Sequence, residues 1–150
     1  MFNLFDFIGL FLLLAGFIIG LGAVTVIDIH GLLGRKSKYW TEATTRTHKV
    51  TKPLIWLGII LALVGGFVFY RDSSLSGIPL IHLLISLGLI LNGLFLSFGV
   101  SPYLLKREKE GRSSELIPKV WQNKIAFSLI LSDLMWWGAL ALLVYYLLLR

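Results

Sequence analysis

Two aspartates lie inside long apolar runs, where an ionised carboxylate is costly. Asp28 precedes the basic residue Arg35 by seven positions, and Asp133 follows Lys124 by nine. At 1.5 Å of rise per helical residue, the two carboxyls lie about 10 and 13 Å inside the same end of two helices. Asn92 lies at a similar depth in a third run. An ionisable side chain so placed costs several kcal/mol without a partner, which predicts a functional site.

These residue types suit the binding of a proton or of a hard cation. Two neighbouring carboxylates repel each other and favour a shared proton, and carboxylate and amide oxygens are also ligands for hard cations. The predicted cation or proton site consists of Asp28, Asp133, Asn92 and His30, although His30 points about 200° away from Asp28 on the same helix. In the alternative interpretation, each polar side chain only fixes helix packing through a hydrogen bond.

The histidines support a second hypothesis, a b-type haem or a metal. A haem in a helix bundle needs axial ligands at one depth on facing helices. His82 lies at the opposite end of its helix, so the candidate ligands are His30 and His48. His48 stands in the polar stretch THKVTKP, which is a poor wall for a haem. The cofactor is therefore undetermined: none is the first expectation and haem b the alternative.

Enzyme chemistry has little support in the sequence. The chain has no cysteine, which excludes disulfides, thiolate metal sites and a cysteine nucleophile. It also contains no nucleotide-binding loop, no HExxH motif and no GxSxG elbow. A non-enzymatic role is therefore favoured over a catalytic one.

Four apolar blocks are long enough to position these residues across a bilayer. Hydrophobic residues make up 57% of the chain, and a membrane-spanning helix needs about 20 of them in succession. The predicted spans are residues 4–33, 54–70, 78–100 and 120–149, with Pro53 in the first turn of the second and Pro102 near the end of the third. The sequence predicts a single all-α domain, a polytopic membrane protein with four transmembrane helices in an up-down-up-down bundle.

Basic residues are concentrated in two of the connections. Residues 35–52 and 106–124 each hold six of the 14 Lys and Arg residues. The positive-inside rule then makes loops 34–53 and 102–119 cytoplasmic and puts both termini on the non-cytoplasmic side of the cytoplasmic (inner) membrane. The net charge of +6 is explained by topology, so no nucleic-acid partner is expected. Candidate residues for binding anionic lipid headgroups are Arg35, Lys36, Lys38, Arg46 and Lys49.

Small residues predict how the first two helices pack. Gly16 and Gly20 share one face of the first helix, and Gly58, Ala62 and Gly65 share one face of the second, so the two faces are expected to meet.

The sequence as a whole predicts a small integral membrane protein that binds a cation or proton, as a transporter or as a subunit of a membrane complex. Its expected partners are the lipid bilayer and either further copies of itself or a larger complex, because four helices are few for a complete carrier. The alternatives are a haem- or metal-binding redox protein and a structural or assembly subunit without a ligand.

Overall fold

The computed structural model describes residues 3–149, and its regular structure is all helical. The elements are α1 (Leu4–Gly34), α2 (Lys38–Phe69), α3 (Gly77–Phe95), η1 (Leu96–Val100), α4 (Ser101–Lys109) and α5 (Lys119–Leu149). α3, η1 and α4 follow one another without a break, so the described chain forms four long helices, each apolar and long enough to cross a membrane. The predicted four apolar spans are confirmed at this level.

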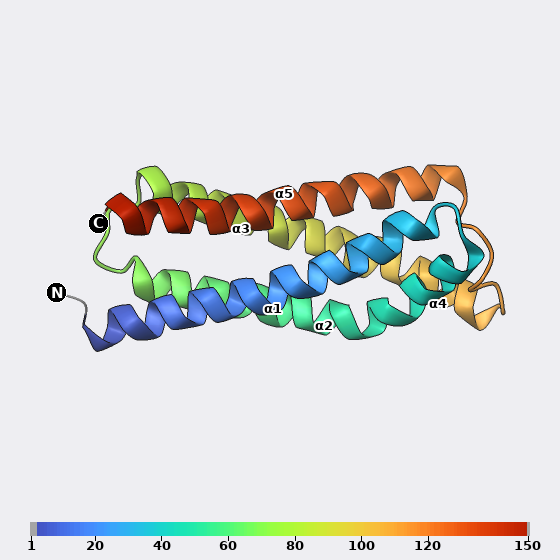
Figure 1. Ribbon diagram of the computed structural model, residues 1–150, viewed down its shortest axis with the longest axis horizontal. Coiled ribbons are helices and arrows are strands. Elements are labelled where there is room, and N and C mark those ends of the chain that lie inside the picture. Colours follow the sequence, from blue (N-terminus) through green and yellow to red (C-terminus); the bar gives the residue numbers. More distant parts are fainter. Residues whose placement is uncertain (1–2, 150) are drawn as a thin grey trace.

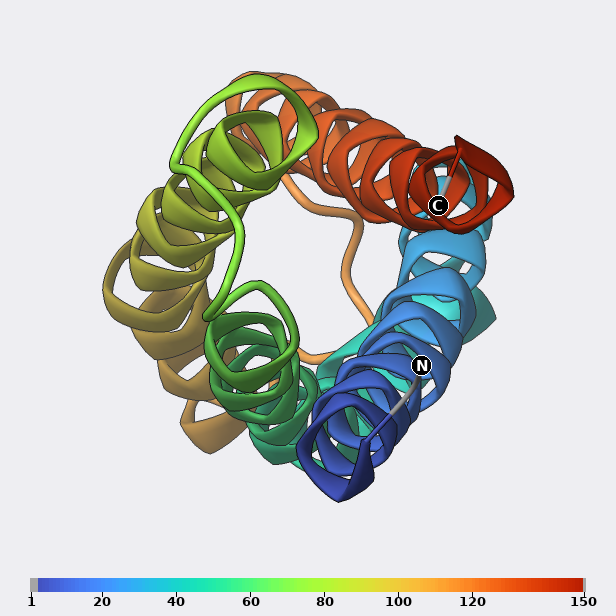
Figure 2. The same ribbon diagram turned by 90° about the vertical axis from the view of Figure 1, so that its left-hand side faces the viewer.

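The helices form an elongated bundle with both chain ends at one end of it (Figure 1). Viewed along the bundle, α1, α2, α3 and α5 surround a common axis (Figure 2). α1 packs closely on α2 along its length and also contacts α5, while α3 contacts α5. Contacts between α2 and α3 are the sparsest of the four neighbouring pairs.

The close packing of α1 on α2 confirms the predicted glycine seam. A Cβ atom built on Gly16 would lie 2.5 Å from the backbone nitrogen of Ala62 and 2.7 Å from the carbonyl oxygen of Gly58. A Cβ on Gly58 would meet the Cα of Gly20 at 2.5 Å. Only residues without a Cβ allow two helix backbones to approach this closely, and this is how helices associate where burial of apolar surface gives no driving force.

The second helix begins earlier than the hydropathy pattern indicates. α2 starts at Lys38, so Pro53 lies in its interior rather than in its first turn. The polar stretch is helical because threonine hydroxyls donate to backbone carbonyls one turn earlier, as Thr44 does to Trp40 at 2.7 Å and Thr51 to Thr47 at 3.2 Å. These bonds satisfy the hydroxyls inside a buried helix face.

The apolar part of the third span ends near Pro102 as predicted, and the helix itself continues past the proline. The chain widens into the π-helical turn η1, in which the backbone N–H of Ser101 donates to the carbonyl of Leu96, and then continues as α4 to Lys109. A proline inside a helix has no N–H and clashes with the carbonyl four residues earlier. One π-helical turn before it accommodates that clash, so the helix bypasses the proline instead of stopping there.

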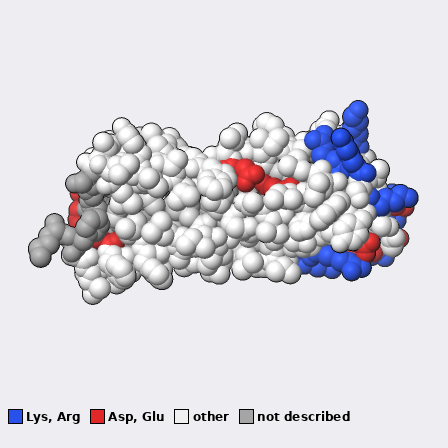
Figure 3. All heavy atoms as spheres, in the orientation of Figure 1, with Lys and Arg blue, Asp and Glu red and all other residues white. Residues whose placement is uncertain are grey.

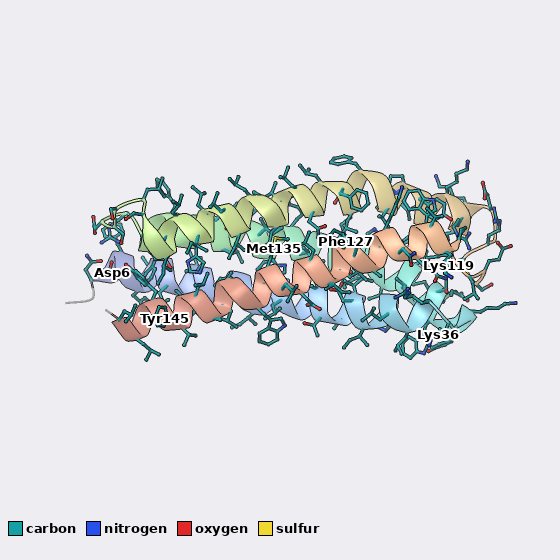
Figure 4. All side chains as sticks on the ribbon, turned by 90° about the horizontal axis from the view of Figure 1, so that it is seen from above. Asp6, Lys36, Lys119, Phe127, Met135 and Tyr145 are labelled. Atoms are coloured by element: carbon teal, nitrogen blue, oxygen red, sulfur yellow. The ribbon has the colours of Figure 1, made fainter. Side chains whose placement is uncertain are left out.

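Most charged residues lie at the two ends of the bundle, and the basic ones are concentrated at one of them (Figure 3). Lys and Arg atoms gather at the end formed by the α1–α2 and α4–α5 connections, here called the basic end (Figure 3). Lys36 and Lys119 lie at this end, whereas Asp6 and Tyr145 lie at the other, here called the terminal end (Figure 4). At the terminal end, Arg71 pairs with Asp6 at 3.2 Å.

The α4–α5 connection is held by a buried arginine. The guanidinium of Arg107 donates to the carbonyls of Glu115 at 2.8 Å, Arg112 at 3.3 Å and Leu116 at 3.4 Å. Gly111, with φ of +71°, makes the sharp exit from α4 that a side chain would hinder. The connection therefore has a defined conformation at the basic end, held by these hydrogen bonds.

Candidate functional site

The carboxyls of Asp28 on α1 and Asp133 on α5 lie within hydrogen-bonding reach of each other. The sequence predicted that both lie at one depth, and the contact between α1 and α5 brings them together. Asp28 is only 3% exposed. One oxygen of each carboxyl, Oδ2 of Asp28 and Oδ1 of Asp133, is buried without a hydrogen-bond partner among the described residues.

Asp28 and Asp133 are the two acidic residues that lie well inside the apolar part of the helices. The remaining six acidic residues are Asp6, Glu42, Asp72, Glu108, Glu110 and Glu115, all toward the helix ends. Figure 3 accordingly shows a patch of acidic atoms halfway along an otherwise uncharged surface. An ionised pair inside an apolar bundle is costly, so its chemistry is that of a group that takes up positive charge.

Asn92 is held close to the pair but has a partner of its own. Its amide nitrogen donates to the carbonyl of Ser128 at 3.1 Å, and the Ser128 hydroxyl donates to the Asn92 oxygen at 2.5 Å. These two hydrogen bonds, here called the Asn92–Ser128 clasp, join α3 to α5 and engage both the nitrogen and the oxygen of the Asn92 amide. The structure therefore gives Asn92 a packing role, next to the cavity that Asp28 also lines.

A cavity of about 70 Å³ lies inside the half of the bundle nearer the basic end. Asp28 lines it together with polar side chains from all four helices, while most of the remaining wall is apolar. The polar lining residues besides Asp28 are Thr44, His48, Thr51, Lys52, Asn92, Ser97 and Ser132. Two of these, Thr51 and Ser132, are buried in the bundle. Through Asp28, the carboxyl pair thus borders a small chamber whose wall is mostly apolar.

The contribution of α2 to this chamber was missed by the sequence analysis. Thr44, His48, Thr51 and Ile55 follow one another at intervals of four, three and four residues, which places them on one helix face. That spacing could have indicated a helix face, but the low hydropathy of residues 34–53 favoured the interpretation as a loop. The helical start at Lys38 turns a presumed loop into one wall of the chamber.

The two histidines of the haem hypothesis are not brought together. Nδ1 of His30 bonds to the carbonyl of Val26 at 2.9 Å, and the ring rests against Trp40 with centroids 5.1 Å apart, on a partly exposed face. His48 instead lines the chamber, with its Nε2 buried and without a partner among the described residues. Axial ligands must face each other across the iron, and these rings do not.

A metal centre finds equally little support in this arrangement. In the part of the chain that the structure describes, no three His, Asp or Glu side chains gather as a group able to hold a metal ion. His30 also stays apart from the carboxyl pair, on the partly exposed face beside Trp40. The titratable acceptors that line the chamber are the carboxyl of Asp28 and the imidazole of His48, which suit protons better than a coordinated metal.

A second cavity, of about 720 Å³, occupies the half nearer the terminal end. It lies mainly between α2 and α3, where helix contacts are sparse. Three buried side chains, Ile59, Leu89 and Trp136, line both cavities and form an apolar layer between them. His82 lines the second cavity and is fixed there, bonded to the hydroxyl of Tyr70 and the carbonyl of Ala139, each at 2.8 Å.

The residues predicted to bind headgroups are all exposed at the basic end: Arg35, Lys36, Lys38, Arg46 and Lys49. Some are engaged within the protein, since Arg46 pairs with Glu42 at 2.5 Å and Lys49 with Glu108 at 2.8 Å. In the adjoining connection, the hydrogen bonds that Arg112 donates to the carboxylates of Glu115 and Glu110 raise the pKa of Arg112 above its ordinary value. The basic end is thus a surface of partly paired charge.

Comparison with protein-family models, with curated proteins and with solved structures gives no match to this chain. The functional argument therefore depends on the residues and their geometry.

Proposed function

We propose that this chain is an integral membrane protein that binds a proton between Asp28 and Asp133. The observation that carries the proposal is the contact between the two carboxyls inside the apolar bundle, with one buried oxygen on each that has no hydrogen-bond partner among the described residues. Two carboxylates about 4 Å apart repel each other by about 4 kcal/mol at an effective dielectric constant of 20. One shared proton removes this repulsion and supplies the missing hydrogen bond.

The orientation of the protein in its membrane is part of the proposal. The basic end, which holds most of the Lys and Arg residues, faces the cytoplasm by the positive-inside rule. Both termini then lie on the other side, and the apolar outer faces of the four helices contact lipid. The carboxyl pair lies in the cytoplasmic half of the bundle, because the chamber beside it is lined by residues of the α2 segment near that end.

Infrared spectroscopy of the protein reconstituted in vesicles tests the proposal. The wild-type protein is expected to show the C=O stretch of a protonated carboxyl near neutral pH, shifting in D₂O and decreasing reversibly as the pH is raised. The Asp28→Asn, Asp133→Asn double variant should lose the band. Asp72→Asn is the matched control, because Asp72 is an exposed carboxylate at the terminal end.

Two results would contradict the assignment. One is a wild-type spectrum without a protonated carboxyl band at any pH at which the protein is folded. The other is a band that persists unchanged in the double variant, which would place the protonated group elsewhere. Circular dichroism of both variants establishes that the helices are intact.

A further inference from the structure

Three buried polar atoms without a protein partner belong to residues that line the same cavity. They are Oδ2 of Asp28, Nε2 of His48 and Nε1 of Trp136. Asp28 is 3% exposed and Trp136 only 1%, so bulk water does not reach these two residues freely. A buried polar group left without a hydrogen bond costs about 1–3 kcal/mol, so the two ring nitrogens, and Oδ2 of Asp28 when the carboxyl pair is ionised, call for a partner that the chain itself does not provide.

The cavity has room to hold that partner as water, beside the few polar side chains of a mostly apolar wall. Its volume of about 70 Å³ leaves room for a few water molecules, since one needs at least about 10–15 Å³. A buried water also needs two to four polar neighbours. Thr44, Thr51 and Ser132 add hydroxyl oxygens to the three unpartnered atoms, and these can accept hydrogen bonds.

The cavity continues toward the basic end and is closed toward the terminal end. A smaller cavity of about 30 Å³ shares four of its lining residues, Gly31, Thr44, Leu104 and Ile125. This smaller cavity is also lined by Arg35, which is exposed at the basic end. In the other direction stands the layer of Ile59, Leu89 and Trp136, in which the indole N–H of Trp136 is the one side-chain hydrogen-bond donor.

We propose that water molecules fill this cavity and connect the Asp28–Asp133 pair to the basic end through His48, so that protons enter and leave from that end alone. The inference rests on the proposed function, because the carboxyl pair is the group that receives the proton. Nε2 of His48 takes a proton from a water on the side of the basic end. The same proton then passes through water to Oδ2 of Asp28, and the imidazole returns to its neutral form.

The other ionisable residue lining the cavity is Lys52. Its cation repels a proton held on His48, while an ionised Asp28 attracts it. This charge arrangement favours movement of the proton from the imidazole toward the carboxyl pair.

Cysteine substitution tests whether water reaches the carboxyl pair. The chain has no native cysteine, so an introduced cysteine is the one thiol that can react with Ag⁺ or a maleimide. Ser132 lines the cavity thirteen residues after the start of α5, and Ser101 lies eight residues before the end of α4 without lining it. They are 6% and 3% exposed, so both are buried, yet Ser101 is the nearer of the two to the basic end of its helix.

We expect Ag⁺, a small soft cation that binds thiolate, to block Ser132→Cys from the basic end in oriented vesicles and to leave Ser101→Cys unblocked. The free thiol is counted by maleimide labelling after denaturation. Equal protection of both thiols, or faster blocking at Ser101→Cys, would overturn the water-filled path. Blocking of Ser132→Cys from the terminal end alone would overturn its direction.

The relay role of His48 has a separate readout, the rate at which the carboxyl band shifts after transfer into D₂O. His48→Ala is expected to slow this exchange by about 100-fold, the scale of a positioned proton-transfer group, and added imidazole to restore it. His30→Ala is the matched control, because His30 lies at the same end on a partly exposed face. An unchanged rate in His48→Ala, or no rescue by imidazole, would remove His48 from the path.

The two proposals fail in different ways. If the wild-type protein lacks the protonated carboxyl band while Ser132→Cys is blocked, the water-filled cavity stands and the proton site does not. If the band is present while Ser132→Cys stays protected, the proton site stands and the path is overturned.

Discussion

Replacing Gly16 by alanine is expected to separate α1 from α2 and destabilise the bundle. The added Cβ would lie 2.5 Å from the backbone nitrogen of Ala62, 2.9 Å from its Cα and 2.7 Å from the carbonyl oxygen of Gly58. All three atoms belong to the backbone, so no side chain can rotate away. Relief requires movement of one whole helix relative to the other.

The size of the effect follows from these distances. Ordinary van der Waals contacts begin at 3.4 Å, so the helices must move apart locally by about 1 Å. Overpacking of this kind costs about 1–3 kcal/mol. A value of about 2 kcal/mol corresponds to a change of about 30-fold in the unfolding equilibrium constant. The loss also includes dispersion contacts along the neighbouring part of the seam, because these weaken with a gap of this size.

The matched control is Gly22→Ala on the same helix, where no described atom lies within 4 Å of the added Cβ. Alanine favours a helix over glycine by up to about 1 kcal/mol, so this variant should be as stable as the wild type or more so. The free energy of unfolding is measured by titrating SDS into mixed micelles while recording circular dichroism. Equal values for the two variants, within about 0.5 kcal/mol, would refute the backbone-contact argument.

Three further variants test the remaining polar contacts. Arg107→Met should remove the hydrogen bonds to the carbonyls of the α4–α5 connection and raise amide hydrogen exchange across residues 110–118, while α1 keeps its protection. Unchanged exchange would show that the connection is stable without Arg107. Asn92→Leu and Ser128→Ala should each cost about 1–3 kcal/mol, but the double variant less than their sum, as a double-mutant cycle of unfolding measures; strict additivity would argue against the clasp. His82→Leu should destabilise the protein by about 1–3 kcal/mol, because it leaves the carbonyl of Ala139 without its donor; a wild-type unfolding midpoint would contradict this.

Several features were predictable because they depend on local sequence. Four apolar blocks predicted four long helices, since a helix satisfies its own backbone in an apolar medium. Glycines at helical spacing predicted the seam, because only close backbones need them. The depth of Asp28 and Asp133 followed from their distance to basic residues, and with it the expectation that the two carboxyls share one layer.

Other features were not readable from single positions. The hydropathy pattern did not indicate the start of α2, because threonines lower the mean hydropathy. Their hydroxyls are nevertheless hydrogen-bonded to carbonyls of their own helix. The helix continues past Pro102 because the π-helical turn η1 accommodates the proline, a backbone adjustment with no clear marker in the residue pattern. Nothing in the charged run KREKEGR distinguishes Arg107 from its neighbours. Its three carbonyl partners lie in the following connection.

Periodicity, apolar length and the position of charge are properties of one segment at a time, and they were enough to predict the helices, the seam and a costly pair of acids. Contacts between helices far apart in the chain depend on how the bundle closes. Only that closure decided that Asp28 meets Asp133, that Asn92 binds Ser128 instead of joining them, and that His48 and His30 face different surroundings. The physical reason is that a buried polar group takes whichever partner the opposite helix presents, and the order and rotation of the helices are set by packing over the whole bundle.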